Sequence, residues 1–126
     1  MAGRINLLPQ VLDLSLYAGD GVDFKMIAKD GAGAPIDITG AVAAHVRLER
    51  LTPDPPIAEF GVNVVDAYQG IVILSLTGEQ TMALSQDPSS SSGKFVGVWD
   101  VQWTPAGSQP RTLVQGKVEC VADVTR

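Results

Sequence analysis

Two stretches in the last third of the chain decide the fold: 94–104 (KFVGVWDVQWT) and 111–124 (RTLVQGKVECVADV), with a short turn segment, 105–110, between them. One face of the first stretch carries Phe95, Gly97, Trp99, Val101 and Trp103. One face of the second carries Val114, Gly116, Val118, Cys120, Ala122 and Val124. Apolar residues at every second position are typical of a strand with one dry face. The two stretches therefore predict a long antiparallel hairpin whose dry face packs on another sheet.

The rest of the chain repeats this pattern in shorter pieces. Further alternating segments occupy 12–16, 22–28, 42–48, 57–65 and 71–76, separated by glycine- and proline-rich turns. The segments 57–65 and 71–76 predict a second hairpin, and Thr77 and Gln80 have the spacing of a helix capping box. We therefore predict an all-β fold, an immunoglobulin-like antiparallel β-sandwich of about seven strands with one short helical turn.

The first twelve residues (MAGRINLLPQVL) differ from the rest. They contain five large aliphatic side chains without a period, and a proline among them. We interpret 1–12 as an extended N-terminal arm that docks on a partner, and 13–126 as the β-sandwich domain. The aliphatic residues of the arm are Ile5, Leu7, Leu8, Val11 and Leu12.

Composition limits the classes of function. The chain has 126 residues, 45% hydrophobic and 18% charged, which fits one globular domain. A net charge of −5 with scattered lysines and arginines argues against nucleic-acid binding. The apolar runs near the N-terminus are too short for a secretory signal or a membrane span, so we expect no membrane partner.

Residues with reaction chemistry are few. Cys120, the single cysteine, excludes an internal disulfide and lies in the apolar register, where we expect it to be buried. His45, the single histidine, is expected to face outward without a catalytic role, and no hydrolase, metalloprotease or phosphate-loop motif occurs. Asp20, Asp23 and Asp30 flank glycine turns and could bind calcium, but turn formation explains them better. We predict neither an enzyme nor a cofactor or metal.

Trp99 and Trp103 allow two interpretations. Exposed, they would form a stacking platform for sugars, and the chain would be a carbohydrate-binding or adhesin-type module. Their apolar register favours the sandwich core instead. The carbohydrate-binding module is kept as the alternative function.

Several motifs resemble those of a known family. The strand 21–25, followed by a "D-x-x-G-x-P" turn and a "D-[LI]-T-G" corner within 30–40, resembles the opening of small phage β-sandwich domains. Those domains close with a "G-x-[YW]-x-V-x-[WY]" strand and a "G-x-V-x-V" strand, to which 97–103 and 116–121 are similar. The pattern, over 13–124, looks like the N-terminal domain of upper baseplate proteins of tailed phages and the LtfC-type proteins of phages infecting actinobacteria.

The resemblance implies a non-enzymatic structural protein of a tailed bacteriophage particle, a minor tail, baseplate, connector or capsid-decorating component. It would be made in the host bacterial cytoplasm and reside in the virion, in several symmetric copies that bind other capsid or tail proteins. Loops and termini are the segments free to make such contacts. The predicted contact residues are Ile5, Leu7, Leu8, Val11, Pro53, Pro55, Pro56, Tyr68, Ser90 and Ser91.

Overall fold

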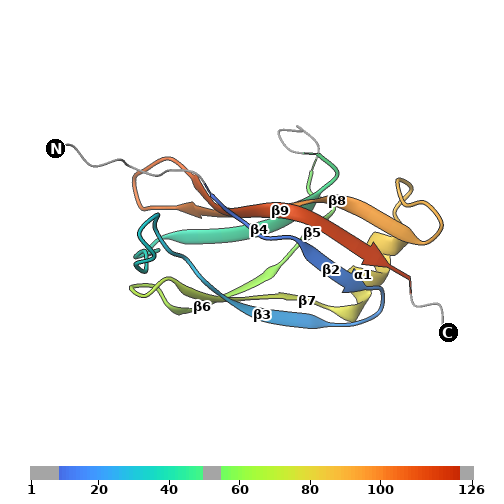
Figure 1. Cartoon of the computed structure of the whole chain (residues 1–126), viewed down its shortest axis with the longest axis horizontal. Coiled ribbons are helices and arrows are strands. Elements are labelled where there is room, and N and C mark those ends of the chain that lie inside the picture. Colours follow the sequence, from blue (N-terminus) through green and yellow to red (C-terminus); the bar gives the residue numbers. More distant parts are fainter. Residues whose placement is uncertain (1–8, 50–54, 123–126) are drawn as a thin grey trace.

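The computed structural model describes residues 9–49 and 55–122, which form nine strands and one helix arranged as two sheets (Figure 1). The predicted all-β sandwich is confirmed. The larger sheet contains β1 (Gln10–Val11), β2 (Leu14–Tyr17), β4 (Ala41–Arg47), β5 (Ala58–Glu59), β8 (Lys94–Thr104) and β9 (Arg111–Val121). The smaller sheet contains β3 (Val22–Ile27), β6 (Gly61–Asp66) and β7 (Ile71–Leu76), and the helix α1 spans Gly78–Ser85.

The hairpin predicted from the last third of the chain lies at the centre of the larger sheet. Strands β8 and β9 are antiparallel, with Trp99 opposite Gly116. Strand β4 pairs with the other edge of β8, and β5 pairs in turn with the far edge of β4. Both β1 and β2 lie parallel to β9, so the larger sheet is mixed rather than wholly antiparallel.

The segment predicted as one strand over 57–65 divides between the two sheets. Its first part is β5, which pairs with β4, and its second part is β6, which pairs with β7 in the smaller sheet. Phe60 stands between them and is only 3% exposed. The chain changes sheets here because the aromatic side chain between the two short strands fits into the core.

The predicted arm is shorter than expected, since the sheet begins before residue 13. Gln10 and Val11 form β1, and the amide of Leu12 donates a hydrogen bond of 2.9 Å to the carbonyl of Gln115. The carbonyl of Leu12 accepts a bond of 2.8 Å from the indole nitrogen of Trp99. Residues 10–12 therefore belong to the sandwich, because the free edge of β9 supplies partners for their backbone.

Three aromatic rings join the sheets in the core. Trp99 is 1% exposed and meets Phe24 edge-to-face, with ring centroids 5.9 Å apart. Phe60 lies 5.6 Å from Trp99 and 6.3 Å from Phe24. Trp103, at the end of β8, packs against this core while partly exposed. The tryptophans thus belong to the core, as predicted, and form no exposed sugar platform.

Helix α1 closes one end of the sandwich, on the right in Figure 1. It begins with the predicted capping box: the Thr77 hydroxyl accepts from the amide of Gln80 at 3.1 Å, and the Gln80 side chain accepts from the amide of Thr77 at 2.9 Å. Thr81 is fully buried one residue later. Its hydroxyl accepts a 3.0 Å bond from the amide of Gly19 and donates one of 2.9 Å to the carbonyl of Asp20. The helix therefore holds the β2–β3 turn.

Substituting this threonine should loosen the closed end of the sandwich. In Thr81→Val the side-chain volume is kept but two backbone groups of the β2–β3 turn lose their buried partner, so we expect a loss of about 1–3 kcal/mol in the free energy of unfolding. Urea denaturation followed by circular dichroism measures this loss. Thr81→Ser, which keeps the hydroxyl, should lose less than Thr81→Val, and equal losses would contradict the role given to the hydroxyl.

Candidate functional site

The outward face of the larger sheet carries an apolar cluster, which we call the outer patch. It consists of Tyr17, Val96, Val98 and Val121. Tyr17 pairs with Val121 in the register of β2 and β9, and side chains of paired residues lie on one side of a sheet. Tyr17 is 62% and Val96 57% exposed, although apolar side chains on a solvent-facing sheet gain nothing from exposure.

Charged residues lie between and beside the apolar residues of the outer patch, since Lys94 is opposite Val121 and Glu119 is opposite Val96. Lys94 and Glu119 form an ion pair of 3.4 Å in which both side chains are about half exposed. Lys117 is exposed beside Val98, and its backbone amide donates to the carboxylate of Asp13 at 2.9 Å. The ion pair thus divides Tyr17 and Val121 from Val96 and Val98. Protein-binding surfaces commonly combine exposed apolar side chains with charged groups.

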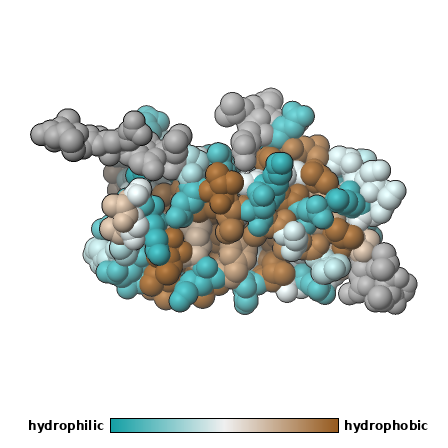
Figure 2. Space-filling view, in the orientation of Figure 1, coloured by the Kyte–Doolittle hydropathy of each residue, from teal (hydrophilic) through white to brown (hydrophobic). Residues whose placement is uncertain are grey.

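Polar residues also divide the rest of the apolar surface. On the side that Figure 2 shows, apolar residues reach the surface in several places with hydrophilic residues between them. Val65, at the bulge of β6 in the smaller sheet, is 56% exposed. The molecule thus offers several small apolar areas.

The structure separates the predicted contact residues. Ile5, Leu7, Leu8 and Pro53 lie outside the described residues. Val11 is 74% exposed in β1, at an edge of the larger sheet, whereas Tyr68, also 74% exposed, lies in the turn between β6 and β7. Val11 and Tyr68 are therefore accessible but belong to different sheets.

The remaining predicted contacts lie in two loops. Pro55 is exposed and Pro56 half-buried, just before β5. In the serine loop, Ser90 is half-buried and donates its hydroxyl to the carbonyl of Leu84 at 2.8 Å, while Ser91 and Lys94 exchange two backbone hydrogen bonds of 3.0 Å. The serine loop is thus held by the sandwich itself.

Asp87 contributes to the same loop. Its carboxylate accepts hydrogen bonds from the hydroxyl and the amide of Ser89, and these bonds hold the pKa of Asp87 below its usual value. The loop therefore keeps a charged carboxylate at neutral pH.

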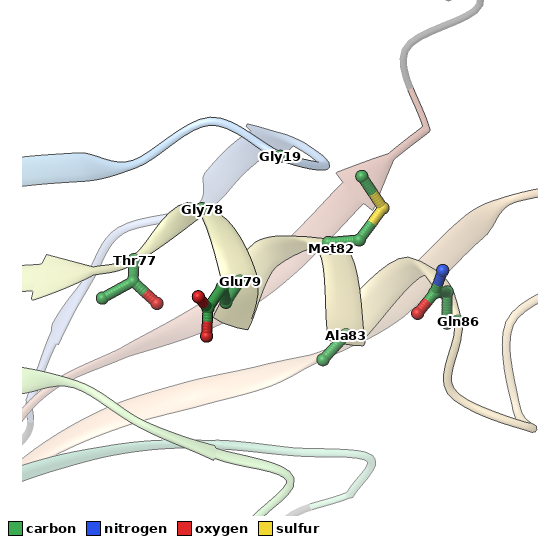
Figure 3. Close-up of a pocket in the computed structure, with 7 residues that line it drawn as sticks. All are labelled: Gly19, Thr77, Gly78, Glu79, Met82, Ala83 and Gln86. Carbon is green, nitrogen blue, oxygen red and sulfur yellow. The ribbon is translucent and has the colours of Figure 1, made fainter.

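One pocket runs along helix α1 (Figure 3). It has a volume of about 720 Å³ and is lined by Gly19, Thr77, Gly78, Glu79, Met82, Ala83 and Gln86. Figure 3 shows the side chains of Glu79 and Gln86 at separate places along the helix, not directed at a common point. The lining has one charged side chain and no converging polar groups, so it does not form a built binding site.

A second pocket, of about 330 Å³, lies at the opposite end of the sandwich. Its lining includes three charged side chains, Lys29, Asp30 and Arg111, from the β3–β4 loop and the start of β9. Apolar walls come from Pro9, Ile36 and Leu113. Charged groups on apolar walls are the combination that favours recognition of a specific ligand.

The residues considered for chemistry lie apart from both pockets. Cys120 is fully buried, as predicted; its thiol donates to the carbonyl of Thr81 at 3.3 Å, and burial raises its pKa. His45 is half-buried on the outward face, opposite Asp100 of β8 and Glu59 of β5. Among the residues described, no group of three or more histidine, cysteine, aspartate or glutamate side chains is placed to hold a metal ion.

The outer patch was not predicted from the sequence, because its residues were considered only for their place in predicted strands. Val96 and Val98 share the outward register of β8 with the polar residues Asp100 and Gln102. Two valines at outward-facing positions of a strand are the signal that could have identified the patch. The contribution of Tyr17 depends on the pairing of β2 with β9, which the local pattern does not reveal.

Comparison with protein-family models finds no match to this chain, and comparison with curated protein sequences finds none either. Within the described part of the chain, no helix has the length and apolar character needed to cross a membrane. The functional assignment therefore depends on the surface and on the motifs of the chain itself.

Proposed function

We propose that this protein is a non-enzymatic structural component of a tailed bacteriophage particle, a minor tail, baseplate, connector or capsid-decorating protein that acts through protein–protein contacts. The observation that carries the proposal is the outer patch: Tyr17 and Val96 are 62% and 57% exposed on one sheet face, and the Lys94–Glu119 ion pair lies between them. Burying such side chains against a partner contributes roughly 25 cal/mol per Å² of apolar surface.

The resemblance to small phage β-sandwich domains supports the same function. The motifs that carry it lie at turns and in the core, at 30–40, 97–103 and 116–121. Several symmetric copies would repeat the contact made by each outer patch, so a weak contact per copy would suffice in a particle. The partners proposed are other capsid or tail proteins.

Mass spectrometry of purified virions of the phage that encodes the chain tests the proposal. We expect the protein to be present, and we expect the double variant Tyr17→Ser, Val96→Ser to be depleted at least about tenfold from particles, since each lost apolar contact weakens docking. Its thermal stability should stay close to that of the unchanged chain, because surface substitutions away from the core have small effects.

Val65→Ser is the matched control. Val65 is 56% exposed, close to the 57% of Val96, but lies on the other sheet. This variant should join the particle normally. Absence of the protein from purified virions would refute the virion role, whereas normal incorporation of the double variant would refute the outer patch as the docking surface.

A further inference from the structure

The second pocket contains an arginine that the fold directs into it. The pairing of β8 and β9 is regular up to Val101, which lies opposite Val114, but the next residue, Gln102, lies opposite Thr112. Leu113 is therefore an extra residue on β9, a β-bulge. The bulge buries two consecutive residues, since Leu113 is 6% and Val114 2% exposed.

The bulge decides where Arg111 points. Beyond it, Arg111 pairs with Trp103, whose side chain packs against the core. Paired residues of antiparallel strands share a face, so Arg111 lies on the inward side at the open end of the sandwich. If the regular register continued through Leu113, Trp103 would lie opposite Thr112 instead. Bulges re-aim side chains in this way at functional sites.

The Nε atom of Arg111 is buried and has no acceptor among the described residues, 9–49 and 55–122. Lys29, which lines the same pocket, is exposed and likewise makes no ion pair with a described residue, whereas Lys94 is paired with Glu119. A buried guanidinium donor left without an acceptor is costly, so a ligand that supplies an acceptor gains affinity.

Asp30, the third charged residue of the pocket, limits the charge of the ligand that the pocket can bind. Asp30 lines the pocket, but one of its carboxylate oxygens accepts from the amides of Ala32 at 2.9 Å and Ala34 at 3.0 Å. Two cations and one carboxylate leave the pocket with a single positive charge. This charge matches a monoanion better than the dianion of a phosphate.

We propose that this pocket binds a carboxylate group, with the Arg111 guanidinium and the Lys29 ammonium as its donors. The fork of an arginine matches the two oxygens of a carboxylate, and Pro9, Ile36 and Leu113 provide apolar walls for a short alkyl stem. The carboxylate belongs either to a free small acid or to an acidic side chain of a protein partner. The inference is independent of the proposed function, because its test uses the purified chain alone.

The test is a titration followed by the NMR signal of the Arg111 Nε–H group. Butyrate stands for a free acid and N-acetylglutamate N-methylamide for an acidic side chain, with phosphate and chloride at the same ionic strength as comparisons. We expect a saturable shift with a dissociation constant on the order of 1 mM for at least one of the two carboxylates. Butyrate binding more tightly would identify a free acid as the source, and the glutamate derivative binding more tightly would identify a protein side chain.

Variants locate the binding. Lys29→Gln, followed by the Arg111 signal, and Arg111→Gln, followed by the backbone amide signals of Leu113 and Ile36, should each weaken carboxylate binding at least about tenfold, the effect of losing one charged hydrogen-bond donor. Lys25→Gln, which removes an exposed cation from the outward face of the smaller sheet, should bind like the unchanged chain. Since Lys29 is exposed, Lys29→Gln should fold normally even if Arg111→Gln does not.

Three results would overturn the proposal. The first is no saturable shift with either carboxylate up to about 50 mM, well above the expected dissociation constant. The second is an equal shift with chloride, which would show charge screening alone. The third is phosphate binding more tightly than both carboxylates, which would reject the charge assigned to the pocket.

Discussion

Trp99→Ala should lower the free energy of unfolding by about 3–5 kcal/mol, the largest effect expected of any single truncation in this chain. Trp99 is 1% exposed and contacts the rings of Phe24 and Phe60, so its removal leaves a cavity at the junction of the two sheets. It also removes the indole bond to the carbonyl of Leu12. Urea denaturation followed by far-ultraviolet circular dichroism measures the change.

Trp103→Ala is the comparison for this experiment. Trp103 also donates its indole N–H to a backbone carbonyl, that of Thr39, at 3.1 Å, but its side chain is only half-buried. Trp103→Ala should therefore lower the free energy of unfolding clearly less than Trp99→Ala does, because less apolar surface returns to water. Equal losses for the two variants would contradict the central place of Trp99 in the core.

Gly116→Ala should be the most disruptive addition of a single methyl group. A Cβ at this position would lie 1.8 Å from the carbonyl oxygen and 2.6 Å from the carbonyl carbon of Leu12. Backbone atoms cannot move aside as a flexible side chain does, so residue 12 must leave the sheet. We expect a loss of about 3 kcal/mol, at the upper end of the usual cost of overpacking, measured by urea denaturation.

A double-mutant cycle identifies the cause of this loss. Trp99→Phe removes the indole donor that holds the carbonyl of Leu12. If Gly116→Ala acts by displacing Leu12, the two changes should cost less together than the sum of their separate costs. Gly21→Ala is the matched control, since the nearest atoms to its Cβ lie at 3.7 Å, and its stability should change by less than about 1 kcal/mol. Additive losses in the cycle would show that Gly116 acts elsewhere.

Local alternation was sufficient to predict most of the strands. On the predicted apolar faces of β8 and β9, every second residue from Phe95 to Val101 and from Val114 to Cys120 is buried, as predicted. The capping box predicted α1 for a similar reason, since Thr77 and Gln80 interact within one turn of the chain. Such features depend on neighbouring residues and are therefore written in the sequence.

The candidate sites were less predictable because they depend on pairings between distant segments. Of the predicted contact residues, Val11 and Tyr68 are highly exposed, but neither belongs to the outer patch. That patch arises because β2 adds parallel to β9 and brings Tyr17 beside Val121. Nothing in the local pattern of 14–17 distinguishes this partner from another strand edge.

The sequence by itself determined the all-β class, the central hairpin and the burial of Trp99 and Cys120, because alternation records which face of a strand avoids water. Only the tertiary structure decided that Phe60 marks a change of sheet, that residues 10–12 join β9, and that a bulge at Leu113 points Arg111 inward. Each of these depends on which backbone groups find partners far along the chain. A one-residue shift in such a pairing reverses the direction of a side chain, and the sequence pattern does not encode that shift.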